Sequence, residues 1–338
     1  MEAEAAPMPT RSHVQRVFAD TLVWDAHCCV SFDDPPRFLP QLARFRDAGF
    51  NLVHLNVGDS TYDFEHVTKM LALFRDWIGA RPEEYVLALT MADAHRAKRE
   101  RKLAVCFDVE GVVSIEDDLS RVALYHDLGV RWMAMVYNRA NLAGSGVHDA
   151  DDRGLTDFGR KLVAEMDRVG LIKDIAHTGY RTARDVCEMS EVPVTISHSN
   201  PRALTDHPRC VPDDLMRACA ATGGVLGISG IGIFLGNNDI SAQNIVRSIE
   251  YSVDVMGVDH VGIGTDFGMA DRSHMEPDFT RRRDVWPAGY GYDGKVEFAP
   301  PERIGEVAEL LLKRGYSDVA VGKILGGNFE RVANEVWK

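Results

Sequence analysis

Strand-like runs of this sequence repeatedly end in side chains that bind metal ions. Six such residues close apolar runs in separate parts of the chain: His27, Cys29, Glu110, His177, His198 and Asp266. Any one of them alone would more commonly be a hydrogen-bonded polar residue or a cap. Their recurrence at the same end of several predicted strands indicates a shared metal site.

The types of these residues suit divalent zinc, manganese or iron. Because Glu110 lies between two groups of candidate ligands, its carboxylate is the natural bridge between two ions roughly 3.5–4 Å apart. His27 and Cys29 are two residues apart on one predicted strand, so both face the same side and could contact one ion. His177 and His198 come from adjacent predicted strands. The set predicts a two-ion site with Glu110 at its centre.

Asp266 closes the last predicted strand. We expect it to lie near a metal-bound water, as a proton shuttle or as a further ligand. A divalent ion lowers the pKa of its bound water from about 15.7 to near 7, which supplies hydroxide at neutral pH. The predicted chemistry is therefore hydrolysis.

Eight apolar runs alternate with amphipathic segments along the chain. The runs are predicted strands at residues 21–27, 51–57, 102–110, 130–137, 170–177, 193–199, 224–229 and 260–266. The clearest helical segments are residues 156–169, 213–221 and 244–256. Since parallel strands need helical crossovers, eight such units predict an α/β fold, a (β/α)8 TIM barrel formed by residues 1–338 as one domain. In that fold the carboxyl ends of the strands carry the active site.

Two irregular segments, residues 138–154 and 267–301, are longer than ordinary loops and are predicted to lie over the mouth of the barrel. The second holds four aromatic residues that could wall a pocket or equally pin the loop: Trp286, Tyr290, Tyr292 and Phe298. It also holds a basic run at residues 281–283, for which a solvated face is favoured over a clamp for a substrate anion.

The composition narrows the class of partner. The chain has 338 residues and a net charge of −13, which argues against a nucleic-acid partner because such proteins concentrate positive charge. The first fifteen residues lack a basic start and an apolar stretch, so we expect no signal peptide, and no apolar run approaches membrane-spanning length. Six scattered cysteines then indicate reduced thiols and a cytoplasmic location.

At the candidate ligands the chain resembles the membrane dipeptidase (renal dipeptidase) family, peptidase family M19, of the amidohydrolase superfamily. The most specific stretches are "GLTDFGRKLVAEMDRVGLIKDIAH" (residues 154–177), "PVTISHSNPR" (193–202), "VGIGTDF" (261–267) and "LGGNFERV" (325–332). The resemblance runs nearly end to end. It implies a (β/α)8 barrel with two zinc ions that cleaves dipeptides by a bridging hydroxide, and assembly as a homodimer.

The resemblance also implies a role for each candidate residue. It places His27 on the first metal ion, Glu110 between both ions, and His177 and His198 on the second. Asp266 matches the catalytic acid/base. Arg209, in "HPRCVPDD", matches an arginine that holds the substrate carboxylate, a role suited to a planar bidentate donor.

Two positions depart from the family pattern. The family has His-x-Asp at the first strand, whereas this chain has Cys29 in place of the aspartate. A thiolate binds zinc at about 2.3 Å, so the first site could persist in altered form, with a shifted preference among Zn²⁺, Mn²⁺ and Fe²⁺. Alternatively, Cys29 is only a small buried residue beside a weak or empty site. Where the family often has a substrate-polarising histidine, the chain has Tyr137, which could donate a hydrogen bond to substrate or simply pack.

These observations favour a metal-dependent dipeptidase acting on dipeptides or related small amides that carry a carboxylate. A second hypothesis keeps the site but changes the substrate to an N-acyl amino acid or lactam. A third is a catalytically impaired barrel that binds a small molecule. Retention of Asp266 argues against the third hypothesis, because a binding protein has no chemical need for a proton shuttle.

Overall fold

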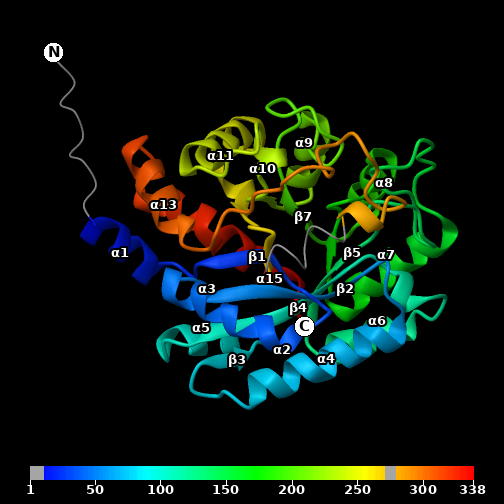
Figure 1. Ribbon diagram of the computed structural model, residues 1–338, viewed down its shortest axis with the longest axis horizontal. Helices are drawn as coiled ribbons and strands as arrows, with labels where there is room; N and C mark the ends of the chain where they lie inside the picture. Colours follow the sequence, from blue (N-terminus) through cyan, green and yellow to red (C-terminus); the bar gives the residue numbers. More distant parts are fainter. Residues whose placement is uncertain (1–10, 271–278) are drawn as a thin grey trace.

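A curled parallel sheet forms the centre of the molecule (Figure 1). The computed structural model describes residues 11–270 and 279–338. Hydrogen-bonded strands follow one another in the order β10-β1-β2-β4-β5-β6-β7-β8-β9. Their bounds are β1 (Trp24–Val30), β2 (Leu52–Asp59), β4 (Leu103–Glu110), β5 (Val130–Ala134), β6 (Ile172–Asp174), β7 (Val194–Ser199), β8 (Leu226–Ile228), β9 (Val261–Ile263) and β10 (Phe267–Met269). Every pairing between them is parallel, so the strands share one carboxyl end.

The two ends of this series meet in one stretch of chain. β9 pairs with β8, and β10, only four residues later, pairs with β1. Between them the amide of Asp266 donates to the carbonyl of His27 over 3.0 Å. β9 and β10 therefore act as the two halves of an eighth barrel strand, which confirms the predicted α/β barrel of the TIM type.

The prediction of eight strands was incomplete. An additional strand, β3 (Tyr85–Leu87), pairs with β4 at the edge of the sheet, and the predicted last strand continues past Asp266 as β10. The predicted strand at residues 170–177 stops at Asp174, so His177 lies in the following loop. The predicted strand at residues 130–137 stops at Ala134. In both cases the strand ends where its backbone pairing with the neighbouring strands ends.

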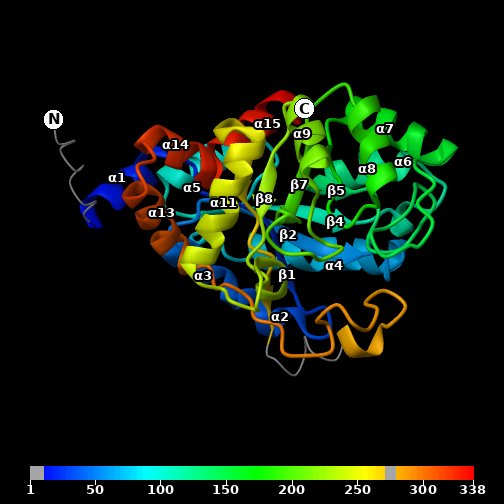
Figure 2. The ribbon, with the colours of Figure 1, turned by 90° about the horizontal axis from the view of Figure 1, so that it is seen from above.

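Helices surround the barrel (Figures 1 and 2). They are α1 (Arg11–Asp20), α2 (Pro35–Phe38), α3 (Leu42–Ala48), α4 (Phe64–Gly79), α5 (Met91–Arg99), α6 (Ser120–Asp127), α7 (Asp157–Val169), α8 (Tyr180–Met189), α9 (Asp213–Ala221), α10 (Gly232–Leu235), α11 (Ala242–Met256), α13 (Arg303–Lys313), α14 (Asp318–Gly322) and α15 (Asn328–Val336). The three predicted helices correspond to α7, α9 and α11. Side-chain caps fix two of their starts, because Thr156 accepts from the Gly159 amide and Ser241 from the Asn244 amide.

Alternation along the strands separates the core from the site. On β2, Val53, Leu55 and Val57 pack outward in the main apolar cluster with the helices. The alternate residue Leu52 belongs to a second cluster inside the barrel, with Trp24 and Trp132. Polar side chains take over the inward positions toward the carboxyl ends. No helix in the described ranges is long and apolar enough to cross a membrane.

Candidate active site

The six predicted ligands converge at the carboxyl ends of the strands. Their potential ligand atoms form three groups, in each of which the atoms lie within 4.8 Å of one another: His27, Cys29 and Glu110; Glu110, His177 and His198; and His27, His198 and Asp266. They come from β1, from the end of β4, from the loop after β6, from β7 and from the break between β9 and β10. The convergence expected from the strand-end pattern is therefore present in the structure.

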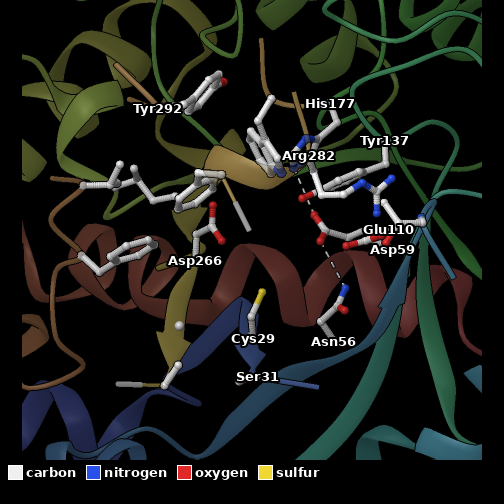
Figure 3. A pocket seen from close by; sticks show the side chains of 18 of the residues that line it. Cys29, Ser31, Asn56, Asp59, Glu110, Tyr137, His177, Asp266, Arg282 and Tyr292 are labelled. Atoms are coloured by element: carbon white, nitrogen blue, oxygen red, sulfur yellow. Dashed lines mark hydrogen bonds and ion pairs between the residues drawn. The ribbon is translucent and has the colours of Figure 1, made fainter. Parts of the chain in front are cut away.

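Glu110 belongs to two of the three groups, and Figure 3 shows its carboxylate between His177 and Asn56. Its Oε1 lies 3.0 Å from Nε2 of His177, 3.4 Å from Nε2 of His198 and 3.6 Å from Nε2 of His27. This oxygen is buried and accepts no hydrogen bond from any described residue. Burial also raises the pKa of Glu110 well above its usual value. The carboxylate thus points an unsatisfied oxygen at three imidazoles, which is the geometry of a bridging ligand.

The outer nitrogen of each imidazole has a hydrogen-bond acceptor. Nδ1 of His27 lies 3.2 Å from the Asp108 carboxylate, and Nδ1 of His177 lies 2.8 Å from Oδ1 of Asn138. Nδ1 of His198 lies 2.7 Å from Oγ of Ser197, whose hydroxyl in turn donates to Asp174 over 2.5 Å. In a neutral imidazole, an acceptor at Nδ1 places the proton there and leaves the Nε2 lone pair directed at the centre, the form that binds a metal ion.

Sequence reasoning missed these supporting residues, although one carried a signal. Asp108 precedes Glu110 by two positions on β4, so alternation places both side chains on the inner face. Asn56 connects the two, since its side-chain amide donates to Asp108 over 2.9 Å and to Glu110 over 3.3 Å. The contacts of Asn138 and Asp174 depend on the tertiary fold and had no comparable signal.

Burial sets the charge of two of the ligands. It lowers the pKa of His177 and of His198 well below the usual value, and the nearby cationic groups lower it further. Both imidazoles are therefore neutral at physiological pH. Their Nε2 atoms lie only 2.9 Å apart. Two facing lone pairs at this distance repel each other unless a cation or a proton lies between them, so the pair fits a metal ion well.

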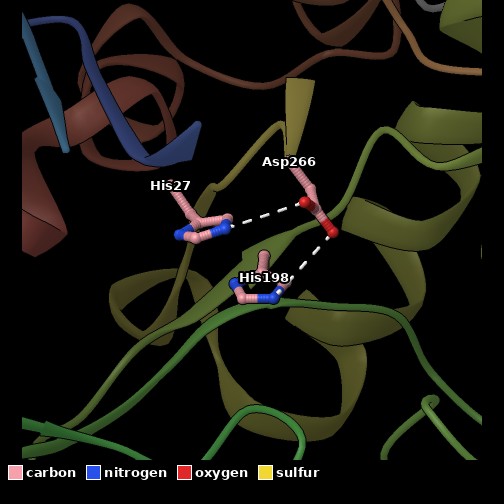
Figure 4. Close-up of side chains that lie close together, drawn as sticks. All are labelled: His27, His198 and Asp266. Carbon is pink, nitrogen blue, oxygen red and sulfur yellow. Dashed lines mark ion pairs between the residues drawn. The ribbon is translucent and has the colours of Figure 1, made fainter. Parts of the chain in front are cut away.

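Asp266 faces the same space from the break in the eighth strand (Figure 4). Its carboxylate oxygens lie 3.7 Å from Nε2 of His27 and 3.9 Å from Nε2 of His198. Its backbone has a φ of 56°, as does that of His177 with a φ of 63°. Left-handed conformations of non-glycine residues cost about 1–3 kcal/mol and cluster at functional sites. Burial raises the pKa of Asp266 to about 6, a value suited to proton transfer near neutral pH.

Cys29 faces the other candidate ligands, as alternation along the strand predicts. Its Sγ lies 3.2 Å from Nε2 of His27, whereas the side chain of Cys28 is fully buried in the outer apolar cluster. Burial raises the pKa of Cys29 to about 12, so the thiol stays protonated until a metal ion or another cation stabilises the thiolate. The position of Cys29 fits a ligand of the ion that His27 would bind.

A cavity of about 230 Å³ opens onto these ligands. Of the two long loops, only residues 267–301 supply lining residues, and the loop at residues 138–154 contacts that loop without lining the cavity. Arg139 donates to the carbonyl of Asp284, and Nε2 of His148 lies 3.1 Å from the hydroxyl of Tyr292. Trp286, Tyr292 and Phe298 line the cavity, while Tyr290 is 41% exposed and lies outside its lining. Of the basic run, Arg282 lines the cavity and is paired with Asp284.

Arg209 lies in the wall of the cavity beside the histidines. A tight turn holds it, because its amide donates to Nδ1 of His207 and its carbonyl accepts from the Ser199 hydroxyl. Its Nη2 lies 2.9 Å from Nε2 of His177. The residue is only 3% exposed, its Nε has no hydrogen-bond partner, and no described carboxylate forms an ion pair with it. A buried guanidinium without an anionic partner is costly, so this wall of the cavity carries a positive charge that no described carboxylate neutralises.

Tyr137 packs against the ring of His177. Its ring centroid lies 4.3 Å from that of His177 and 5.6 Å from that of Trp286. Tyr137 lines the cavity, and burial raises the pKa of its phenol well above the usual value, so the hydroxyl remains a neutral donor. Its backbone lies after β5, where sequence reasoning expected the end of a strand.

Comparison with known proteins identifies the family. The family model of membrane dipeptidases, peptidase family M19, matches residues 42–281. The chain belongs to this family. It is accordingly a hydrolase of the metal-dependent dipeptidase class, and the three ligand groups described above are consistent with metal dependence.

Individual proteins similar to this chain are consistent with its membership of the family. An uncharacterized protein in the pqqA 5′ region of Klebsiella pneumoniae is 27% identical over 80% of this chain and 96% of its own length. The dipeptidase verJ of Clonostachys rogersoniana is 30% identical over 74% of this chain but only 60% of its own length. Among solved structures, an amidohydrolase from Pseudomonas aeruginosa superposes with a TM-score of 0.87 at 28% identity, covering 96% of this chain and 99% of that one.

Proposed function

We propose that this protein hydrolyses the amide bond of dipeptides, or of closely related small amides that carry a free carboxylate. The observation that carries the proposal is the placement of Arg209 beside the candidate metal ligands: its Nη2 lies 2.9 Å from His177, whose Nε2 is 3.0 Å from Glu110. An anion-binding group and a metal centre thus share one cavity. A carboxylate held by Arg209 brings a neighbouring amide bond to the metal ligands.

The donor set supports two zinc ions. His27, Cys29 and Glu110 would hold one ion, and Glu110, His177 and His198 the other. Bound there, a divalent ion supplies a Lewis acid for the scissile carbonyl and lowers the pKa of a water molecule to about 7. The mixture of imidazole, carboxylate and thiolate suits zinc, while Mn²⁺ or Fe²⁺ is the alternative if Cys29 does not bind.

Asp266 handles the proton in this proposal. Its carboxylate faces His27 and His198 at 3.7 and 3.9 Å, so it would be within reach of a water molecule activated between the candidate ligands. The carboxylate accepts a proton from that water and then transfers it to the leaving amine nitrogen, which needs the proton to depart. A pKa near 6 allows both transfers near neutral pH.

Tyr137 serves the carbonyl oxygen. Its neutral phenol lies over His177 and borders the cavity, so its hydroxyl is placed to donate a hydrogen bond to the oxygen on which negative charge develops. Because a phenol carries no positive charge, its contribution is smaller than that of an imidazolium.

A substrate panel tests the proposal. Purified protein is loaded with Zn²⁺, Mn²⁺ or Fe²⁺ and assayed with dipeptides of both configurations at the C-terminal residue, and with N-acyl amino acids and lactams. We expect the dipeptides to have the highest kcat/KM. The variants Asp266→Asn and His198→Ala should lose turnover, whereas Asp254→Asn, an exposed aspartate on α11, should not. Preferred cleavage of N-acyl amino acids or lactams would replace the dipeptidase assignment, and absence of metal and of all activity would favour a small-molecule binder.

Two further proposals extend the expectations from the sequence. A cytoplasmic location is supported by the scattered cysteines, all six of which are free thiols in the structure. Assembly as a homodimer is supported only by resemblance to the family. Fractionation of the source cells and light scattering of the purified protein test them separately.

A further inference from the structure

One side of the cavity is formed by an apolar cluster that is separate from the barrel core. Its buried members are Cys210, Ile231, Phe234, Tyr292 and Val296, and its partly buried members are Ile233, Phe279, Trp286 and Phe298. All of them except Cys210 line the cavity. The eight lining residues come from α10 with the residue before it and from the loop at residues 267–301. We call these nine residues the mouth cluster.

The aromatic rings of the mouth cluster are packed edge to face. Trp286 lies 4.9 Å from both Tyr292 and Phe279, with interplanar angles of 71° and 88°. Such contacts fix the rings in place, so the wall is formed before any ligand arrives. Ile233, Phe279, Trp286 and Phe298 remain only partly buried while facing the cavity. Their uncovered apolar surface is available to a ligand.

The mouth cluster adjoins the anion-binding arginine. Arg209 directly precedes Cys210, and its guanidinium carbon lies 5.4 Å from the ring centroid of Phe234. When Arg209 holds the carboxylate of a dipeptide, the side chain of the C-terminal residue of that dipeptide therefore lies against the mouth cluster. Apolar surface buried there adds to the binding free energy in proportion to its area.

The opposite side of the cavity carries more polar side chains than the mouth cluster does. Ser31, Asp33, Asn56, Asp59 and Thr61 line it, together with the aromatic residues Phe32 and Tyr62. Figure 3 shows Asp59 and Asn56 on one side of the site and Tyr292 on the other. The two halves of a substrate that spans the metal ligands thus meet walls of different chemistry.

We propose that the residue bearing the substrate's carboxylate carries a large apolar or aromatic side chain, which the mouth cluster binds, whereas the residue on the other side of the scissile bond is small or polar. This inference rests on the proposed function. It specifies which dipeptides the cavity prefers.

Matched dipeptides test the inference in the metal-loaded protein. Ala-Phe, Phe-Ala and Ala-Ala are compared, each in both configurations of the C-terminal residue. We expect kcat/KM for the better Ala-Phe isomer to exceed that for Ala-Ala by about 10- to 100-fold, with no such gain for Phe-Ala. Equal values for Ala-Phe and Ala-Ala would overturn the inference while leaving the proposed function intact. A gain for Phe-Ala alone would also overturn it.

Variants locate the selectivity. Trp286→Ala should reduce the ratio of Ala-Phe to Ala-Ala by about fivefold or more, and Ile233→Ala gives a second test if the first variant folds poorly. Tyr290→Ala is the matched control, because Tyr290 lies in the same loop but outside the cavity lining. A ratio that is unchanged in both Trp286→Ala and Ile233→Ala would remove the mouth cluster as the cause.

A binding measurement separates the two proposals. If no dipeptide is hydrolysed, the proposed function fails, yet calorimetry with free phenylalanine and alanine still reports on the subsite. At least about tenfold tighter binding of phenylalanine by the metal-loaded protein, lost in Trp286→Ala, would support the apolar subsite. Equal binding of the two amino acids would overturn it.

Discussion

The carboxylate of Asp108 lies 3.2 Å from Nδ1 of His27, on the far side of the imidazole from the Nε2 atom that faces Glu110. This contact fixes which nitrogen of His27 is available to a metal ion. Burial alone would lower the pKa of His27, but the neighbouring Cys29, Asp108 and Glu110 raise it well above its usual value. In the metal-free protein His27 therefore holds a second proton, which a metal ion must displace when it binds.

Replacing Asp108 by asparagine should weaken metal binding without removing any ligand. In Asp108→Asn, an amide oxygen turned toward His27 leaves the amide nitrogen facing Asn56, where a donor meets a donor. We expect zinc affinity to fall about 10- to 100-fold. Competition with a chromophoric chelator measures it, and Asp254→Asn provides the control. Unchanged zinc affinity in Asp108→Asn would show that the contact does not orient His27.

The thiol of Cys29 should appear in the spectrum of the metal-loaded protein. With Co²⁺ in place of zinc, we expect a sulfur-to-metal charge-transfer band in the near ultraviolet that is lost in Cys29→Ser and in Cys29→Asp. Cys28→Ala is the matched control. The side chain of Cys28 packs in the main apolar cluster, so its removal should leave the band intact. If the wild-type protein binds Co²⁺ without this band, Cys29 is not a ligand.

Much of this site follows from alternation and strand ends. The spacing of His27 and Cys29 predicted a common face, and the structure places their reactive atoms 3.2 Å apart. β3 was missed because it pairs with β4 alone at the edge of the sheet, a tertiary contact that a short apolar run does not reveal. The contact between His148 and Tyr292 joins residues 144 positions apart, so it depends on loop conformations that local sequence does not determine.

The activity should fall in acid because of Asp266. Burial raises the pKa of this carboxyl from 3.8 to about 6. Only the deprotonated form accepts a proton from water, so kcat/KM should decrease about tenfold for each pH unit below the pKa. A bound cation favours the carboxylate and shifts the limb to lower pH. The pH profile of the metal-loaded protein at constant metal content tests this, and an acid limb well above pH 6 would assign the titration to another group.

The same shift has a consequence for stability. Because the folded pKa of Asp266 exceeds its unfolded value, the folded state binds more protons between about pH 4 and 6, and stability declines as pH rises through that window. This rise in the pKa of Asp266 corresponds to about 3 kcal/mol. In metal-free protein, Asp266→Asn should reduce this decline, as urea unfolding at pH 4 and pH 7 would show. An identical decline in wild type and variant would contradict the assigned environment.

The buried charge of Arg209 should lower the stability of the fold while it strengthens substrate binding. Its guanidinium is buried beside His177 and has no described carboxylate partner. Removing the charge in Arg209→Met keeps much of the side-chain volume, so we expect a Tm equal to or higher than that of the wild-type protein. The KM for dipeptides should rise about 100-fold, the loss of a charge-assisted contact. Dipeptide amides, which lack the carboxylate, are the control: their kcat/KM should change far less. An equal loss for acids and amides would mean that Arg209 acts on something other than the substrate carboxylate.

The hydroxyl of Tyr137 offers the sharpest test of how this chain departs from its family. If the phenol donates to the developing negative charge, Tyr137→Phe should lower kcat by about 10- to 100-fold with little change in KM, because the contact strengthens only in the transition state. The ring contacts with His177 and Trp286 persist in the phenylalanine variant, so a purely packing role predicts wild-type kcat. Tyr137→His introduces the imidazole that the family resemblance suggests for this position, and recovery of kcat in that variant, relative to Tyr137→Phe, would show that the reaction requires a hydrogen-bond donor here.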